Sequence, residues 1–102
     1  DDYHRTGAIY SLSPARSKPM NPPGQWNTME ITLKGKNILV SINGRSVTDF
    51  DPDGPVPERK QQWEPERGPR PETGYIGLQN HEDYDPNTHV YFKEVSERRL
   101  TQ

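Results

Sequence analysis

The residues best placed for chemistry are Gln79 and His81, two positions apart in the segment 74–81 (GYIGLQNH). Alternation predicts a strand here, so Gln79 and His81 point to one face while Ile76 and Leu78 take the other. If Ile76 and Leu78 enter a core, the first pair faces the open side of the sheet. An imidazole at such a place can move a proton near neutral pH or bind a metal ion. The alternative is that His81 only ends a strand in solvent, and spacing alone favours this alternative.

A second polar cluster lies at the start of the chain, where Asp1 and Asp2 precede His4 and Arg5. Carboxylates suit acid–base chemistry, and they also suit a hard divalent cation. A charged terminus with no further role explains the same residues equally well. We interpret His4, beside Arg5, as a positional rather than a catalytic residue.

Two aromatic residues in predicted loops, Trp63 and Tyr84, are candidates for ligand contact, because exposed rings offer an apolar face for stacking. Trp26 begins a predicted strand and is interpreted as an anchor, and Glu30 lies on a solvated strand face. The aspartates 51, 53, 83 and 85 match no calcium-loop spacing. No nucleophile elbow, phosphate loop or zinc helix occurs, and the chain has no Cys.

The elements that must position these residues are strands. Period-two alternation predicts them at residues 6–12, 26–34, 37–42, 45–50, 74–80 and 89–95. Gly35-Lys36 and Asn43-Gly44 are typical of tight hairpin turns. Residues 51–73 hold six prolines and no periodicity, which predicts a long loop that is either functional or mobile, with Trp63 pinning it to a surface. No segment has sustained helical spacing with caps.

Length and composition indicate one small all-β domain, an antiparallel sandwich or jelly roll. The 102 residues are only 27% hydrophobic, which is low for a self-sufficient core. Six strands are also few for a closed sandwich. We therefore expect an incomplete sandwich that spans residues 1–102, with further N-terminal strands supplied by a parent chain or another copy, or an edge left exposed.

The charge and hydropathy patterns limit the kinds of partner that the chain is expected to bind. Thirteen Lys and Arg stand against fifteen Asp and Glu, for a net charge of −2, so no basic stripe is present for a nucleic acid. No apolar run is long enough to span a bilayer. An open sheet edge predicts self-association or pairing with the missing strands.

Three stretches, in this order along the chain, carry more than a strand pattern: Asp1-Asp2 followed by residues 4–12, then residues 24–50, then residues 70–81 with 89–100. The matching positions are Gly24, Trp26, Asn27, Glu30, Ile31, Asn43, Gly44, Gly74, Ile76 to Gln79, His81, Val90, Phe92, Lys93 and Val95. Together they resemble the 3-keto-disaccharide hydrolase family, whose domains are concanavalin-like jelly rolls. Met29 departs from the aromatic residue that the family often has there, and this chain resembles the C-terminal portion of such a domain.

This resemblance implies a carbohydrate-active domain similar to 3-keto-glycoside hydrolases or lyases, located in the periplasm or outside the cell. His81 and Asp2 would be the acid–base pair, and a divalent metal ion is a plausible cofactor. The residues implied in substrate binding are Asp1, Arg5, Trp63, Gln79 and Tyr84. The alternative is a non-catalytic module that binds carbohydrate or protein within a larger secreted protein.

Overall fold

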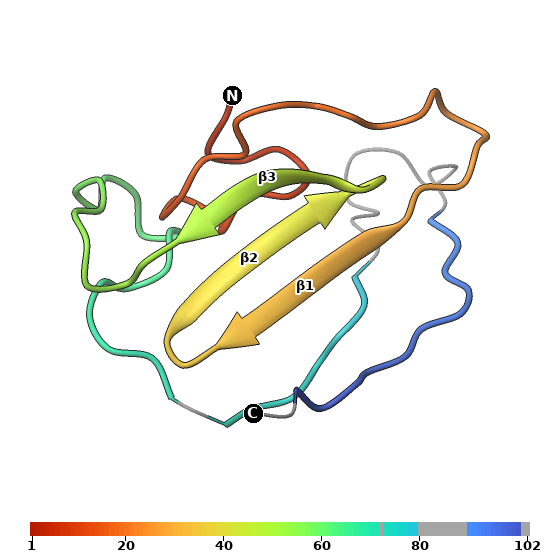
Figure 1. Cartoon of the computed structure of the whole chain (residues 1–102). Helices are drawn as coiled ribbons and strands as arrows, with labels where there is room; N and C mark the ends of the chain where they lie inside the picture. Colours follow the sequence, from red (N-terminus) through yellow and green to blue (C-terminus); the bar gives the residue numbers. More distant parts are fainter. Residues whose placement is uncertain (72, 80–89, 101–102) are drawn as a thin grey trace. The chain divides into compact units, whose positions relative to one another are not determined.

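The computed structural model describes residues 1–71, 73–79 and 90–100, and its regular structure is a single antiparallel sheet. The strands are β1 (Met29–Lys34), β2 (Asn37–Ile42) and β3 (Arg45–Phe50), in the spatial order β1-β2-β3 (Figure 1). No helix occurs among the described residues, so the predicted all-β class is confirmed. The predicted strands at 37–42 and 45–50 have the predicted bounds.

Both hairpin turns use residues that tolerate a positive φ. Asn43 and Gly44 have φ of 52° and 81°, the signature of a type I′ turn, whose twist matches that of the flanking strands. Gly35 has φ of 61°, as the first central residue of a type II′ turn does. The meander is therefore fixed by its turns as well as by its alternating side chains.

Asn43 also ties the second hairpin to the segment that precedes β1. Its backbone N–H donates to the carbonyl of Thr28 at 2.8 Å, and its side-chain oxygen accepts the N–H of Thr28 at 2.9 Å. The side-chain amide of Asn43 donates to the carbonyl of Pro19 and to Oδ1 of Asn27, both at 2.8 Å. One turn residue thus fixes the path of a Pro-rich stretch that has little secondary structure of its own.

The core lies on one face of β2 and β3. The buried side chains there are those of Val40, Ile42, Val47, Thr48 and Phe50. A register shift near Val40 and Ser41 marks a bulge, where β3 contributes one residue more than β2. Ile42, Val47 and Thr48 are nearly inaccessible to solvent as a result.

Residues 1–16 cover this face, and Figure 1 shows them (red) beside β3. The N–H of Arg16 donates to the carbonyl of Val47 at 2.9 Å, and the hydroxyl of Thr48 donates to the carbonyl of Gly7 at 2.7 Å. Gly7 has φ of 97°, and a Cβ added there would stand 2.9 Å from Cγ2 of Val47. Only glycine fits both the backbone angle and the contact.

The Pro-rich loop after β3 is ordered by charged side chains. The carboxylate of Glu64 accepts the backbone N–H of Lys60 at 3.0 Å and that of Gln61 at 2.7 Å. Arg67 pairs with this carboxylate at 3.3 Å and donates to the carbonyl of Pro57 at 2.9 Å. These bonds hold the loop in one conformation without a ladder.

Two strand predictions in the N-terminal part of the chain differ from the structure. Residues 6–12 form turns with one isolated bridge, Ile9 to Ser13, because Gly7 and Ser11 both have positive φ. Residues 26–28 precede β1, since the bonds of Thr28 go to the Asn43 turn.

The chain divides into two compact units, Asp1–Glu72 and Thr73–Gln102. In the second unit the described residues, 73–79 and 90–100, have no strand, which differs from the predicted strands at 74–80 and 89–95. A strand requires a hydrogen-bonded ladder, and no described residue forms one with these segments. The structure therefore supports a three-stranded antiparallel sheet, and the sandwich stays a prediction.

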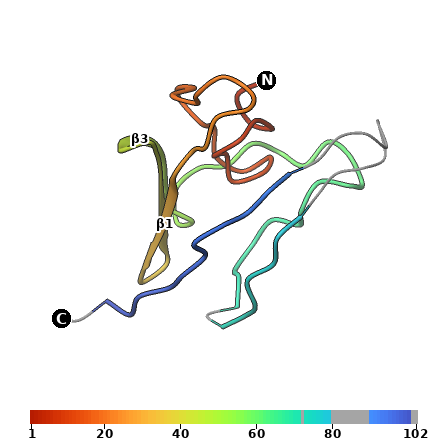
Figure 2. The same cartoon turned by 90° about the vertical axis from the view of Figure 1, so that its right-hand side faces the viewer.

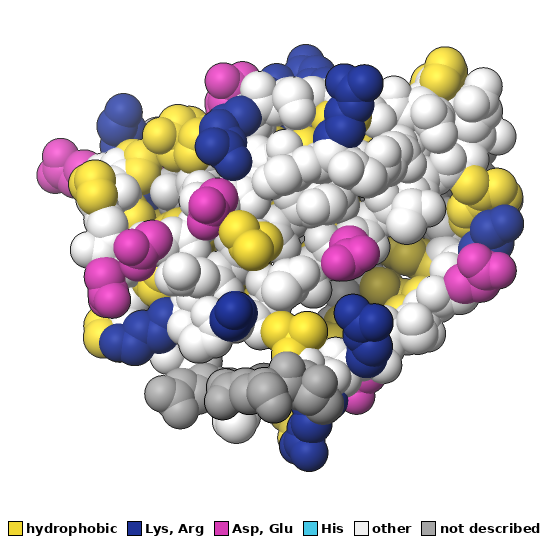
Figure 3. Space-filling model, in the orientation of Figure 1, with side chains coloured by type: hydrophobic (Ala, Val, Ile, Leu, Met, Phe, Trp, Pro, Cys, Tyr) yellow, Lys and Arg dark blue, Asp and Glu magenta, His cyan; other side chains and the backbone are white. Residues whose placement is uncertain are grey.

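Charged side chains of both signs are interspersed on the face shown in Figure 3, and neither sign gathers in one patch there. This agrees with the nearly balanced charge of the sequence. Within the described residues, no helix is long and apolar enough to cross a membrane.

Candidate functional site

His4 is the centre of the most developed polar arrangement in the first unit. Its Nδ1 lies 2.9 Å from Oδ1 and 3.0 Å from Oδ2 of Asp1, and its Nε2 lies 2.8 Å from Oγ of Ser11. A turn at residues 1–4, closed by the bond from the N–H of His4 to the carbonyl of Asp1, brings the carboxylate over the ring. Ser11 reaches the other nitrogen from a left-handed backbone conformation, with φ of 64°.

The hydrogen bonds indicate which tautomer a neutral imidazole adopts here. An ionised carboxylate can only accept, so the hydrogen on Nδ1 points at Asp1. In the neutral ring Nε2 is then an acceptor, and the hydroxyl of Ser11 donates to it. Both ring nitrogens are therefore engaged, and the free lone pairs of this group belong to the exposed carboxylate of Asp1.

Two aromatic rings enclose the imidazole. The ring of Tyr10 meets it edge-on at a centroid distance of 4.7 Å, and the indole of Trp63 does so at 5.6 Å. The rings of Tyr10 and Trp63 are 5.8 Å apart. Trp63 keeps 60% of its surface exposed and Tyr10 keeps 51%, so each packs with one side and offers the other to solvent.

His4, Asp1, Ser11 and Trp63 line an open hollow of about 330 Å³, which we call the His4 hollow. Its walls come from the N-terminal turn and from the Pro-rich loop; the lining residues are Asp1, Tyr3, His4, Ser11, Pro57, Glu58, Lys60, Gln61, Trp63 and Glu64. The size is at the lower end of the roughly 300–1,000 Å³ of small-molecule sites. A hollow with one aromatic wall and several polar groups suits a small polar ligand with an apolar face.

Glu64 holds the loop side of the hollow in place. Burial of its carboxyl group raises the pKa, but the backbone N–H groups of Lys60 and Gln61 and the guanidinium of Arg67 together lower the pKa below the ordinary value of 4.5. Glu64 is therefore ionised at neutral pH and serves as an acceptor that organises the loop. Arg67 also donates to the carbonyl of Ser11 at 3.4 Å. This bond links the loop to the serine whose hydroxyl contacts His4.

The structure brings two of the predicted substrate-binding residues, Asp1 and Trp63, into this hollow. Asp2 and Arg5 lie nearby but outside its lining: they pair at 3.2 Å, and Arg5 also donates through Nε and Nη2 to the carbonyl of Ala15. These contacts hold the N-terminal segment in place. The predicted catalytic role of Asp2 and the predicted binding role of Arg5 stay predictions.

The remaining predicted site residues belong to the second unit. Gln79 is among the described residues of this unit. His81 and Tyr84 lie outside the described residues. Their predicted roles stay predictions.

Sequence reasoning missed His4 and Ser11 as partners. No local spacing pairs them, because the contact depends on the positive φ of Ser11 and on turns that a strand prediction for residues 6–12 excludes. One signal could have pointed to His4. Two carboxylates, Asp1 and Asp2, precede it closely, and a run rich in small residues follows it. His4 was assigned only a positional role.

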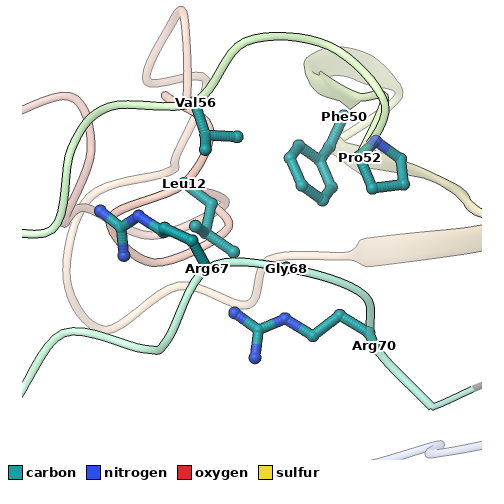
Figure 4. Close-up of a pocket in the computed structure, with 7 residues that line it drawn as sticks. All are labelled: Leu12, Phe50, Pro52, Val56, Arg67, Gly68 and Arg70. Carbon is teal, nitrogen blue, oxygen red and sulfur yellow. The ribbon is translucent and has the colours of Figure 1, made fainter.

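A second, smaller cavity lies at the end of β3, between Phe50 and Pro52 on one side and Leu12 and Val56 on the other (Figure 4). Its volume is about 30 Å³, enough for one water molecule. The side chain of Arg67 runs along it and is already engaged with Glu64 and with backbone carbonyls. This cavity is a packing gap and is too small for an organic ligand.

The divalent metal ion that the resemblance implies has no ligand set in the described part of the chain. No group of three or more His, Asp or Glu side chains there is arranged to hold an ion. Asp1 offers one carboxylate, and the nearby His4 has both nitrogens in hydrogen bonds.

The chain matches the family model of the 3-keto-alpha-glucoside-1,2-lyase-like domain over residues 1–97, and it belongs to this family. Membership places it among carbohydrate-related, hydrolase-like domains. No curated protein and no solved structure matches the chain significantly.

Proposed function

We propose that this domain binds a 3-keto sugar in the His4 hollow and contributes to cleavage of its glycosidic bond by elimination. The observation that carries this function is the juxtaposition of the Asp1 carboxylate with the exposed indole of Trp63 around one imidazole. Membership in the 3-keto-alpha-glucoside-1,2-lyase-like family supports it.

The hollow supplies an aromatic ring for stacking on a sugar and polar groups for hydrogen bonds to its oxygens. The apolar C–H face of a pyranose stacks on Trp63, as sugars do on exposed aromatic rings. Lys60 and Gln61 line the same hollow and offer donors to ring hydroxyl or carbonyl oxygens. A ring seated there lies within reach of the Asp1 carboxylate.

The chemistry follows from the 3-keto group, which acidifies the hydrogen on C2. A base takes this proton, the electron pair forms the C1=C2 double bond, and the bond from C1 to the glycosidic oxygen breaks. The leaving alkoxide takes a proton from an acid, and water can add back to the double bond. Asp1, oriented by His4, is the base in this account, and His4 keeps the carboxylate fixed by its Nδ1–H bond.

The predicted pair of His81 and Asp2 is the competing assignment for the same reaction, with Gln79 and Arg5 holding oxygens. Both assignments require that the protein cleave the 3-keto sugar, so one assay compares them.

A non-catalytic carbohydrate-binding role is the second candidate function. It is favoured by the engagement of both nitrogens of His4, which leaves the ring without a free site for proton transfer. In this role Trp63 would provide the stacking surface and the Asp1 carboxylate would only accept hydrogen bonds.

The experiment offers the protein a 3-keto-glucoside and follows release of the aglycone. Wild type is compared with Asp1→Asn, His81→Ala and Trp63→Ala. Loss of release in Asp1→Asn with retained binding supports our assignment, whereas loss only in His81→Ala favours the competing pair. Binding without release in the wild type would make the domain a binding module.

A further inference from the structure

β1 forms one outer edge of the sheet. Among the described residues it pairs only with β2, and Figure 2 shows the sheet with β1 toward the viewer. An edge strand presents unpaired backbone N–H and C=O groups. Its side chains Met29, Ile31 and Leu33 belong to the core face of the sheet, yet they remain exposed, Leu33 by 64%. This edge therefore offers hydrogen bonds and apolar surface together.

The hairpin fixes which backbone groups point outward. In a two-residue hairpin the pair next to the turn, here Lys34 and Asn37, exchanges both of its hydrogen bonds. Bonded and non-bonded pairs then alternate, so Thr32 and Glu30 also bond inward to β2. The N–H and C=O groups that point to the outer edge are those of Met29, Ile31 and Leu33.

We propose that this edge pairs with the same edge of a second copy of the chain, antiparallel, about a two-fold axis at Thr32. In that register Ile31 of one copy and Leu33 of the other exchange backbone hydrogen bonds. Glu30 stands opposite the partner's Lys34, and this occurs twice by symmetry. The two sheets become one six-stranded sheet with a continuous apolar face.

The charges on β1 argue for a second copy as the occupant. Glu30 and Lys34 are both exposed, and four residues of strand separate them by about 13 Å, too far for a contact within one chain. Across the two-fold axis they become non-hydrogen-bonded neighbours, the pairs whose side chains approach most closely. An edge with charges of one sign would repel its own copy, but this edge is self-complementary.

The first test is charge reversal followed by sedimentation of the whole chain at increasing concentration. We expect the wild type to reach twice the chain mass of 11.8 kDa. Glu30→Lys or Lys34→Glu alone should weaken the dimer about tenfold or more, since two attractive pairs become repulsive. The double variant Glu30→Lys/Lys34→Glu restores both pairs and should dimerise like the wild type.

Cysteine cross-linking tests the register, because the chain has no native Cys. Thr32→Cys faces its own copy and should oxidise to a covalent dimer, whereas Glu30→Cys alone should not. A mixture of Glu30→Cys and Lys34→Cys should give the mixed dimer. A wild type that stays monomeric would overturn the proposal, and protection of the outward amides of Met29, Ile31 and Leu33 from hydrogen exchange would then show that the chain covers its own edge. Equal cross-linking of Thr32→Cys and Glu30→Cys would overturn the register.

Discussion

The indole of Trp63 meets the imidazole of His4 edge-on, with ring centroids 5.6 Å apart and ring planes at 62°. This contact joins the Pro-rich loop to the N-terminal turn and so creates the wall of the His4 hollow. The indole is held on one side and exposed on the other. It thereby orders the loop and leaves a surface for a ligand.

Trp63 should dominate sugar binding. Replacing it by Ala removes the stacking face and the contact with His4, and we expect binding of a 3-keto-glucoside to weaken at least tenfold, or about 1.4 kcal/mol. Trp63→Phe keeps a ring and should retain most of the affinity. Calorimetric titration of the two variants measures the difference, and equal weakening in both would point to a loss of loop structure instead.

Gly7 should tolerate no side chain. Gly7→Ala puts a methyl group 2.9 Å from Cγ2 of Val47, and we expect a loss of about 2 kcal/mol or more in the free energy of unfolding. Gly24→Ala is the matched control, since Gly24 also has a positive φ, 92°, and has no atom within 4 Å of the added group. Urea unfolding of both variants separates steric overlap from backbone strain; equal losses would contradict the packing described for Gly7.

Asn43 should stabilise the fold through both its backbone and its side chain. Asn43→Gly keeps the positive φ and the backbone bond to Thr28 but loses the side-chain bonds to Thr28, Pro19 and Asn27. We therefore expect a loss of about 1–3 kcal/mol in the free energy of unfolding. Asn43→Ala should cost about 1 kcal/mol more, because alanine is strained in the left-handed region. Thermal unfolding measures both, and an Asn43→Gly variant as stable as the wild type would remove the side-chain bonds from the account.

The lowered pKa of Glu64 predicts an acid-sensitive loop. The native state favours the ionised carboxylate, so its stabilisation is complete above the unfolded pKa of 4.5 and is lost as the pH falls below it through the lowered folded pKa. Trp63 fluorescence should report loosening of the loop in this range. Glu64→Gln should loosen the loop already at pH 7 and flatten the acid dependence, while Glu66→Gln, at an exposed neighbour, should behave as the wild type does.

The sequence predicted the meander well because local rules decide it. Alternation and the turn residues Gly35, Asn43 and Gly44 are sufficient for β1 to β3, since each strand pairs with its sequence neighbour. The order of the loop after β3 was not predictable, because it depends on Glu64 accepting backbone N–H groups rather than on any periodicity. Trp63 was correctly predicted to pin that loop.

The site was predictable only in part. Asp1 and Trp63 were both predicted to contact a ligand. These predictions rested on the chemistry of each side chain alone, a carboxylate and an exposed aromatic ring. Their meeting around His4 depends on long-range folding and on the unusual backbone of Ser11, which alternation misassigns to a strand. The roles of Gln79 and His81 remain predictions from pattern and family resemblance.

The most direct test of the His4 hollow as the sugar site uses the two indole N–H signals of the chain, from Trp26 and Trp63, in a nuclear magnetic resonance titration with a 3-keto-glucoside. Trp63→Phe assigns the signals. The account predicts that the Trp63 signal shifts on titration while that of Trp26 stays in place. A shift of the Trp26 signal alone, or sugar binding that moves neither signal, would contradict it.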